Sequence, residues 1–332
     1  MPLNRRFILM ACAVLPAAVH VACFAQTSRP DSSADYPGRA IRLVVPSAPG
    51  GGTDLIARSV APRVSQAWRQ SVVVENVSGG ATTIGTTAVA RSAPDGHTML
   101  LTTVNFAFVP AIYPQLAYDP KTDFTPVVMI ATQSSMVSVH PSLPARSVAE
   151  LIALARKRPG EIRYGSGGSG SVGHLSSELF RSMAGIKLLH VPYKGNGPVV
   201  TALVSGELHM MITNIAAALP HVKSGRIKGL AVTSVARSRI VPELPTVGES
   251  GLPGYEYSGW YGLWVPAKTP RAVVRRINEE FNRALTNATL RERFLEAGIE
   301  PQGGSDEKFA AYLSAEFSKW AKVARDANIG ME

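Results

Sequence analysis

The chain has 332 residues, a formal net charge of +10 and only two cysteines, Cys12 and Cys23. Both cysteines lie in an N-terminal segment that we expect to be removed, which excludes disulfides, thiolate metal sites and a cysteine nucleophile in the mature protein. Arg5 and Arg6 leave with that segment, which holds no acidic residue, so the charge falls to +8. The basic residues are scattered and form no recognised nucleic-acid module, so the charge favours small anions over nucleic acid as partners.

The first 25 residues have the organisation of a secretory signal peptide. Arg5 and Arg6 supply a positive start, residues 7–19 are almost entirely apolar, and small residues lead to a cleavage site after Ala25. The apolar run is shorter than the about 20 residues of a membrane-spanning helix. We therefore expect export to the periplasm, by the general or the twin-arginine route, with cleavage near Ala25. His20 stands where a lipobox has a bulky aliphatic residue, which disfavours lipid attachment at the second cysteine.

The remaining chain of about 300 residues is long enough for two domains with a substantial core. A leader rich in Ser, Asp and Pro at residues 26–35, which we expect to be flexible, precedes short β-rich runs that alternate with helical patterns. Helices are predicted at 53–67 and 172–183, and a capping box of Ser147 and Glu150 opens another. Strands are predicted at residues 41–45, 72–74, 98–101, 127–130, 136–139, 162–164, 188–191, 208–212, 227–233 and 261–265.

The C-terminal third of the chain is predicted to be helical, with apolar residues recurring every three or four positions. These stripes are packing faces, because one side of a helix repeats at that spacing. They consist of Val273, Ile277, Phe281 and Leu285 in one helix, and Phe309, Leu313, Phe317 and Trp320 in the last. Strands that alternate with helices predict an α/β fold with mainly parallel sheets. Ligands of such sheets bind where loops leave the carboxyl ends of strands.

The first loop of interest, residues 46–54, joins the 41–45 strand to a helix for which Thr53 or Asp54 is the expected N-cap. Its glycines let the backbone approach a ligand closely, and the helix N-terminus offers free amides and partial positive charge. The Gly-Lys-Ser/Thr ending of a phosphate-binding P-loop is missing. The alternative is a tight turn in which Asp54 only caps the helix. The candidate binding residues are Ser47, Gly50, Gly51, Gly52, Thr53 and Asp54.

The second loop, residues 165–171, lies between the 162–164 strand and the 172–183 helix and repeats this arrangement with three added hydroxyls. Hydroxyls and amides together suit a carboxylate, which accepts several hydrogen bonds at once. His174, on the first turn of the helix, either contacts the ligand or packs. The candidate binding residues here are Ser166, Gly168, Ser169, Ser171 and His174.

Enzymatic and metal-binding alternatives find little support. Gly165, Gly167 and Gly170 fit the Gly-x-Gly-x-x-Gly dinucleotide pattern, but the required acidic residue is absent from residues 188–192. The nucleophile elbow of serine hydrolases, Gly-x-Ser-x-Gly, is absent. No histidines are spaced as a metal-binding pair. We therefore predict no catalytic residue, no cofactor and no metal.

Two further strand ends carry polar or aromatic residues. Tyr193 lies in a turn after the 188–191 strand, where it could cover a ligand, and the neighbouring Lys194 is expected to face solvent. Thr213 follows the 208–212 strand, again at a carboxyl end. Trp260, Tyr261 and Trp264 are expected to pack the returning strand and not to stack on a substrate.

Several ordered segments together resemble the Bug (TctC-like) family of extracytoplasmic solute receptors, from about Tyr36 to the C-terminus. The resemblance rests on residues 36–41, 45–51, 93–98, 164–166, 174–175, 190–195, 220–225, 230–233, 244–247 and 262–267. It implies a monomeric, two-lobed fold of the type II periplasmic-binding-protein kind, with two mainly parallel sheets flanked by helices. Backbone amides and ordered water at the two glycine-containing loops then hold a ligand in a cleft between the lobes.

The resemblance also implies lobe boundaries and partners. Lobe 1 would comprise residues 36–131 with 255–332, and lobe 2 residues 132–254, with hinge strands near Thr132 and Tyr255. The ligand would be delivered to the membrane permease subunits of a tripartite tricarboxylate transporter. A ligand-sensing accessory of a two-component system is the alternative role.

Three departures from the family pattern bear on the ligand. The turn after Asn76 differs from the usual one, and Thr213 stands where many members carry an acid that could meet a ligand amine. Residues 105–110, with Phe106 and Phe108, are more apolar than the usual polar turn. The missing acid and the two phenylalanines argue against an amino acid and favour a mono-, di- or tricarboxylate, including one with an aromatic or apolar body.

Overall fold

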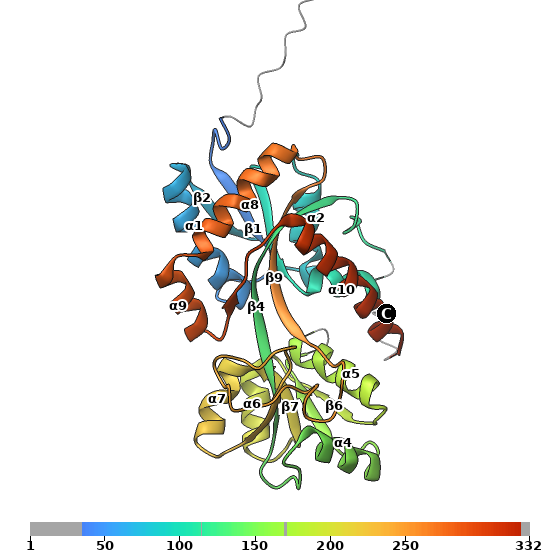
Figure 1. Ribbon diagram of the computed structural model, residues 1–332. Helices are drawn as coiled ribbons and strands as arrows, with labels where there is room; N and C mark the ends of the chain where they lie inside the picture. The colour runs from blue at the N-terminus through green and yellow to red at the C-terminus, as the bar shows by residue number, and fades with distance from the viewer. Residues whose placement is uncertain (1–34, 114, 169–170, 327–332) are drawn as a thin grey trace, which may run out of the picture.

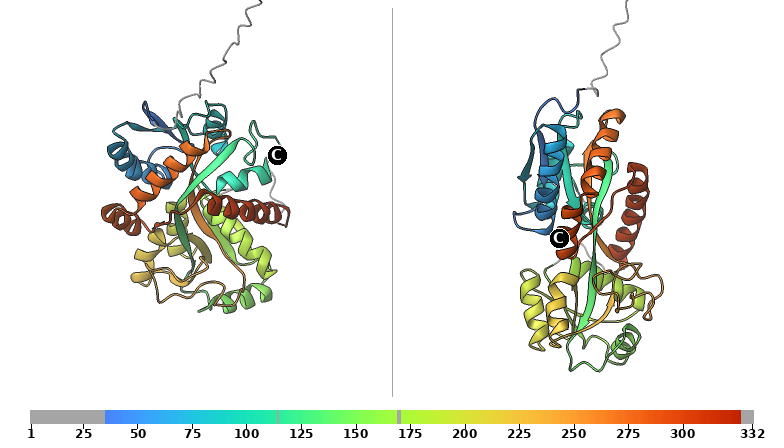
Figure 2. Two further views of the ribbon diagram at one scale, coloured as in Figure 1. Left: turned by 45° about the horizontal axis from the view of Figure 1, so that its top comes forward. Right: turned by 60° about the vertical axis from the view of Figure 1, so that its left-hand side comes forward.

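The computed structural model describes residues 35–113, 115–168 and 171–326, which fold into two lobes joined by long strands (Figures 1 and 2). The predicted signal peptide and nearly all of the predicted leader lie outside the described residues. Within these ranges, no helix has both the length and the apolar composition needed to cross a bilayer.

Lobe 1, the upper one in Figure 1, is built on a sheet with strand order β2-β1-β3-β9-β4, to which β10 adds at β4. Its strands are β1 (Ile41–Val45), β2 (Val72–Asn76), β3 (Thr98–Thr103), β4 (Phe124–Val139), β9 (Ser258–Pro266) and β10 (Glu300–Pro301). Its helices are α1 (Gly52–Trp68), η1 (Gly80–Thr82), α2 (Thr83–Ala90), α3 (Asn105–Ile112), α8 (Arg271–Leu285), α9 (Ala288–Glu296) and α10 (Asp306–Asp326). The first three strands are parallel, whereas β9 and β4 run antiparallel to their neighbours.

Lobe 2 is built on the far half of β4 with β7, β5 and β6, and β8 pairs with the other edge of β4. Its remaining strands are β5 (Arg163–Ser166), β6 (Leu189–Pro192), β7 (Met210–Asn214) and β8 (Lys228–Val232). Its helices are α4 (Val148–Lys157), α5 (Val172–Ala184), α6 (Asn196–Val204) and α7 (Ile215–Lys223). The predicted two-lobed α/β fold is confirmed, and its sheets are mixed because the shared strands β4 and β9 run against the parallel sets.

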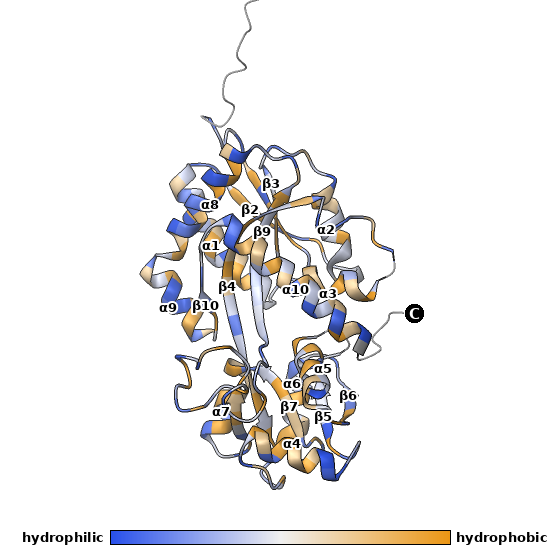
Figure 3. Ribbon diagram, turned by 45° about the vertical axis from the view of Figure 1, so that its right-hand side comes forward, coloured by the Kyte–Doolittle hydropathy of each residue, from blue (hydrophilic) through white to orange (hydrophobic). Residues whose placement is uncertain are grey.

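One continuous strand, β4, replaces the two strands predicted at 127–130 and 136–139. Residues 132–135 between them are polar and break the apolar pattern, yet they continue the ladder: Ser134 pairs with Ser258 of β9, and Ser135 pairs with Asn214 of β7. The hydropathy colouring shows β4 losing its apolar character where it passes between the lobes (Figure 3). Buried polar side chains therefore mark the crossing, although the residues that bound each lobe stay a prediction.

The strand register brings the carboxyl ends of both parallel sets to this crossing. In lobe 1, Thr103 at the end of β3 pairs with Tyr261, just after β9 has entered the lobe. In lobe 2, Asn214 at the end of β7 pairs with Ser135, just after β4 has entered the lobe. Because β1 is parallel to β3, and β5 is parallel to β7, the loops that follow β1 and β5 face each other across the crossing strands.

The cores follow the predicted helix stripes. Val273, Ile277, Phe281 and Leu285 of α8 are buried against one face of the lobe 1 sheet, as predicted. On the other face, Phe309 and Leu313 of α10 are buried, Phe317 is partly buried, and Trp320 is fully buried in a cluster that continues into lobe 2. Helix α10 also contacts α5, so its C-terminal half lies against both lobes (Figure 1).

The helix starts predicted from the sequence are partly correct. Ser147 caps α4 by accepting a hydrogen bond from the Glu150 amide, as the capping box predicted, whereas the Glu150 carboxylate accepts from the Arg146 amide and not from that of Ser147. Helix α1 instead begins after Gly51, so neither Thr53 nor Asp54 is its N-cap, and that prediction is wrong. Phe106 and Phe108 belong to helix α3 and are about 1% exposed in the core, so they carry no information about the ligand.

Candidate functional site

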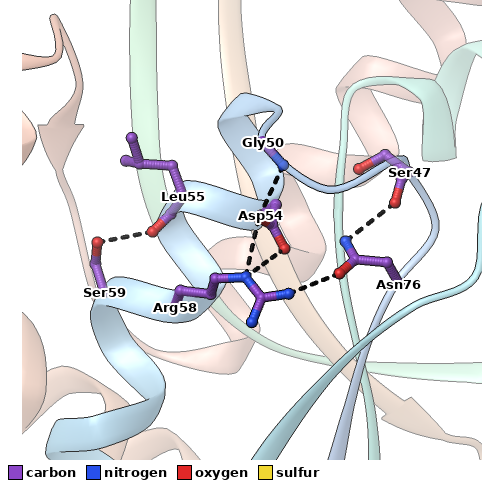
Figure 4. Close-up of polar contacts among 7 residues, drawn as sticks. All are labelled: Ser47, Gly50, Asp54, Leu55, Arg58, Ser59 and Asn76. Atoms are coloured by element: carbon purple, nitrogen blue, oxygen red, sulfur yellow. Dashed lines mark hydrogen bonds and ion pairs between the residues drawn. The ribbon is translucent and has the colours of Figure 1, made fainter.

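The loop after β1 is organised by Asp54, whose carboxylate turns back onto the loop (Figure 4). Asp54 accepts hydrogen bonds from the Gly50 amide at 3.0 Å and from Arg58 Nε at 2.9 Å. Arg58 also donates to Asn76 Oδ1, and Asn76 Nδ2 donates to the Ser47 carbonyl at 3.1 Å. Burial opposes ionisation of Asp54, but these hydrogen bonds outweigh it and hold the pKa of the carboxyl below its usual value. Asp54 therefore shapes the loop.

The N-terminus of α1 keeps its amides available because no side chain caps it. Its first helical hydrogen bond runs from the Leu55 amide to the Gly51 carbonyl, which leaves the amides of Gly52, Thr53 and Asp54 without a helical acceptor. Unpaired amides at a helix N-terminus, together with the positive end of the helix dipole, favour an anion.

Gly52 is in close contact with Tyr261 on the crossing strand β9. A β-carbon at position 52 would lie 2.8 Å from the Tyr261 hydroxyl, so a larger residue would fit only if that hydroxyl or the first turn of α1 moved. The Tyr261 hydroxyl donates to Gln133 Oε1 at 2.9 Å, and both residues are buried. Burial raises the pKa of Tyr261 to about 12, so the hydroxyl stays protonated. The first turn of α1 thus contacts Tyr261 of β9, which in turn is hydrogen-bonded to Gln133 of β4.

Two candidate hydroxyls have no hydrogen-bond partner among the described residues. Ser47 Oγ, after β1, and Thr213 Oγ1, near the end of β7, are buried atoms from opposite lobes. A buried polar atom left unpaired costs about 1–3 kcal/mol, which a ligand or water that pairs with it would recover. Both strand ends therefore present polar groups suited to a ligand.

In the second loop, Ser166 and Ser171 have distinct structural roles. Ser166 is about 1% exposed and bonds within the loop, while Ser171 Oγ caps α5 by accepting from the His174 amide. Gly168 has φ of +115°, a backbone conformation open mainly to glycine. Ser169, also predicted to bind ligand, lies outside the described residues.

His174 is packed and not exposed to a ligand surface. Its ring is buried and stacks on His190 with centroids 4.5 Å apart. Burial, followed by repulsion from His190, lowers the pKa of His174 to about 4, so it is neutral at pH 7. Of the two roles predicted for His174, ligand contact or packing, these surroundings fit packing.

Tyr193 is held from outside the loop. Its hydroxyl donates to Glu207 at 2.9 Å, and its ring packs on the cluster under α6. Tyr193 can therefore offer a ligand its ring edge or backbone but not a free hydroxyl. The neighbouring Lys194 is exposed, as expected.

Gln133 and Tyr261 are the residues of this region that the sequence analysis missed. Gln133 lies in the polar stretch of residues 132–135 within an apolar strand pattern, a signal of the lobe crossing. Tyr261 was expected only to pack, as Trp260 and Trp264 do, and its contact with Gly52 joins residues from distant parts of the chain. Among the described residues, no three His, Cys, Asp or Glu side chains are grouped to hold a metal.

Comparison with known proteins identifies the family. The sequence model for the tripartite tricarboxylate transporter family receptor (TctC) matches residues 56–329. Protein BugT of Bordetella pertussis is 34% identical, over 90% of this chain and 92% of that protein. The structure of R. palustris Rpa4515 with adipate superimposes with a TM-score of 0.75 at 40% identity, covering 89% of this chain and 99% of the other.

A second solved structure agrees. MatC from Rhodopseudomonas palustris with bound malate has a TM-score of 0.71 at 31% identity, covering 87% of this chain and 99% of the other. The two superpositions each extend over most of the chain. The chain therefore belongs to the TctC (Bug) family of tripartite tricarboxylate transporter receptors, which are solute-binding proteins and not enzymes.

Proposed function

We propose that this protein is a periplasmic receptor that captures a small dicarboxylate between its lobes and delivers it to the membrane permease subunits of a tripartite tricarboxylate transporter. The carrying observation is the uncapped helix N-terminus that each lobe directs toward the strand crossing. In lobe 1 this is α1, with N-cap Gly51, and in lobe 2 it is α7, with N-cap Asn214. A ligand with two separated negative charges matches two such ends.

The comparisons support this ligand class. Adipate, bound by Rpa4515, and malate, bound by MatC, are both dicarboxylates. The unpaired hydroxyls of Ser47 and Thr213 would complete the hydrogen bonds of one carboxylate in each lobe. Thr213, a neutral residue, gives no counter-charge for a ligand amine, which disfavours amino acids.

Ligand capture by lobe closure follows from this division of contacts. A ligand shifts the equilibrium between open and closed lobes only by its differential affinity for the two states. A dicarboxylate that contacts α1 in lobe 1, and α7 together with the loop after β5 in lobe 2, completes its hydrogen bonds only when the lobes are closed. The crossing strands β4 and β9 are the natural hinge, because they are the strands that continue from one sheet toward the other.

The binding step is tested by thermal unfolding of the mature protein with adipate, malate, citrate, aspartate and a nucleotide. A ligand present at 100 times its Kd stabilises the native state by about 2.7 kcal/mol, which is a clear rise in Tm. We expect adipate or malate to raise Tm most. Aspartate, whose amine finds no counter-charge at Thr213, should raise Tm less than malate. A response to the nucleotide alone, or to aspartate more than malate, would contradict the proposed ligand class.

The delivery step needs a separate measurement. Membrane vesicles that contain the permease subunits of the same organism should take up the labelled dicarboxylate only when the purified receptor is added. Receptor with Gly52→Val, which blocks the first turn of α1, is the matched control and should not support uptake. Uptake that is equally fast without the receptor would rule out a delivery role.

A further inference from the structure

The hydroxyl of Ser166 is the centre of a small network beneath the loop after β5. Ser166 Oγ lies 2.6 Å from His190 Nε2, 3.2 Å from the Gly168 carbonyl oxygen and 3.3 Å from the Gly168 amide nitrogen. The Ser166 side chain thus bridges both polar groups of the Gly168 backbone. Those contacts close the turn at Gly167 and Gly168 in the loop that we propose contacts the ligand.

Counting protons assigns the direction of each hydrogen bond. A serine hydroxyl has one proton to donate and two lone pairs to accept. If Ser166 donates to the Gly168 carbonyl and accepts from the Gly168 amide, its remaining lone pair must accept from His190. All contacts of Ser166 are satisfied only when His190 carries its proton on Nε2. With the proton on Nδ1 instead, Ser166 would donate to His190, and the Gly168 carbonyl would keep only its bond from the Ser171 amide.

The His190 ring is held in place on both faces. It stacks on Tyr164, with centroids 4.8 Å apart and planes at 14°, and on His174 at 4.5 Å and 22°. Tyr164 is fixed in turn, because its hydroxyl donates to Glu178 Oε1 at 2.6 Å. Glu178 is also paired with Arg181 on the next turn of α5. The charged and titratable groups around the stack are therefore Tyr164, Glu178, Arg181 and the two imidazoles themselves.

We propose that His190 is the positioning residue of the ligand loop: its Nε2–H holds Ser166, which fixes the shape of the Gly167–Gly168 turn and so the fit of this loop to a carboxylate. Ser166 then acts on the loop and not directly on the ligand, which revises its role as a predicted binding residue. This inference rests on the proposed function, since the turn matters only if a carboxylate binds there. It adds a residue, His190, to which the sequence pattern assigned no role.

Binding measurements separate the hydrogen bond from simple packing. His190→Phe keeps a flat ring between Tyr164 and His174 but removes the donor, and we expect it to weaken binding of adipate, or of malate if that binds more tightly, at least tenfold. His190→Gln restores an Nε2 donor and should bind within threefold of wild type. His209→Gln is the control, because His209 accepts from the Arg163 amide at the opposite end of β5 and should leave affinity unchanged.

Two outcomes would overturn the inference while leaving the proposed function intact. One is wild-type affinity in a natively folded His190→Phe variant, with folding checked by circular dichroism and Tm. The other is equal loss of affinity in the Phe and Gln variants, which would show that restoring the donor does not restore binding.

A ligand-free measurement judges the inference even if the wild-type protein binds no carboxylate, a result that would refute the proposed function. Nitrogen-15 NMR of histidine-labelled protein should show His190 as the neutral Nε2–H tautomer, with a slowly exchanging Nε2 proton. Ser166→Ala should speed exchange of that proton, and His209→Gln should not. Detection of the Nδ1–H tautomer at His190 would overturn the proposed direction of the hydrogen bond.

Discussion

The two glycine-containing loops have similar sequences but different support. The loop after β1 is tied by a charged network, in which Asp54 bonds to Arg58 and Arg58 bonds to Asn76, with the Arg58 side chain about half exposed. The loop after β5 is tied by neutral, partly buried groups, with Ser166 bonded to His190 and His190 stacked between two rings. Charged support depends on carboxylate ionisation and salt, whereas buried imidazole support depends on keeping histidine neutral.

The largest expected effect concerns lobe 2 and acid. The pKa of His174 is about 4 in the folded chain and about 6.5 when unfolded, so the unfolded state binds more protons between these values. Its contribution is intact above pH 6.5 and is lost as pH falls toward 4, at a cost of about 3 kcal/mol. Urea unfolding at pH 7, 5.5 and 4.5 measures this loss.

The matched variant for that experiment is His174→Phe, which keeps a ring in the stack but cannot be protonated. Its unfolding free energy should fall less steeply with acid than that of the wild type. Parallel curves of unfolding free energy against pH would show that His174 does not titrate in this window. The two loops would then not differ in their response to acid for the reason given.

The next largest effect tests the seat of the first loop. Gly52→Ala places a methyl group 2.8 Å from the Tyr261 hydroxyl, and such overpacking costs about 1–3 kcal/mol. Ligand affinity should fall as well, because the first turn of α1 must move. Adding Tyr261→Phe removes the clashing oxygen and should recover part of the stability. A double variant no more stable than Gly52→Ala in urea unfolding would argue against this contact.

A smaller effect tests the charged support. Asp54→Asn keeps an oxygen for the Gly50 amide but loses the ionic bond to Arg58, for an expected cost of about 1 kcal/mol. The exposed pair of Arg42 and Glu75 is the control, and Glu75→Gln should cost less than about 0.5 kcal/mol. Equal costs for both variants in urea unfolding would mean that Asp54 does not organise its loop.

The smallest stability change is expected at Thr213. Thr213→Val removes a buried hydroxyl without a partner among the described residues, so stability should stay within about 1 kcal/mol of wild type or rise. Dicarboxylate affinity should fall severalfold, measured by calorimetry. Unchanged affinity in this variant would remove Thr213 from the proposed ligand contacts. Lobe 2 would then contact the ligand through its main chain.

Sequence reasoning predicted best what depends on neighbours along the chain. The stripe of α8 and the Ser147 cap of α4 came out as expected, because helix period and capping are local. Helices α2, α3, α6 and α7 were missed, since they are short and their segments lack a clear polar face. The α1 cap was misplaced because Asp54 bonds backward to the Gly50 amide and not to the helix start.

The candidate site shows the same division. Its two loops were predicted from glycines between a strand and a helix, a pattern visible in the sequence alone. The two-lobed fold and the receptor family were predicted from the sequence as well. Their supports were not predictable: the Tyr261 hydroxyl bonds to Gln133, 128 residues earlier, and His190 bonds to Ser166, 24 residues earlier. The sequence by itself determined the elements and the chemistry available, because these depend on local periods and residue types. Only the tertiary structure decided which of those groups meet, because strand register and the crossing of β4 and β9 join segments far apart in the chain.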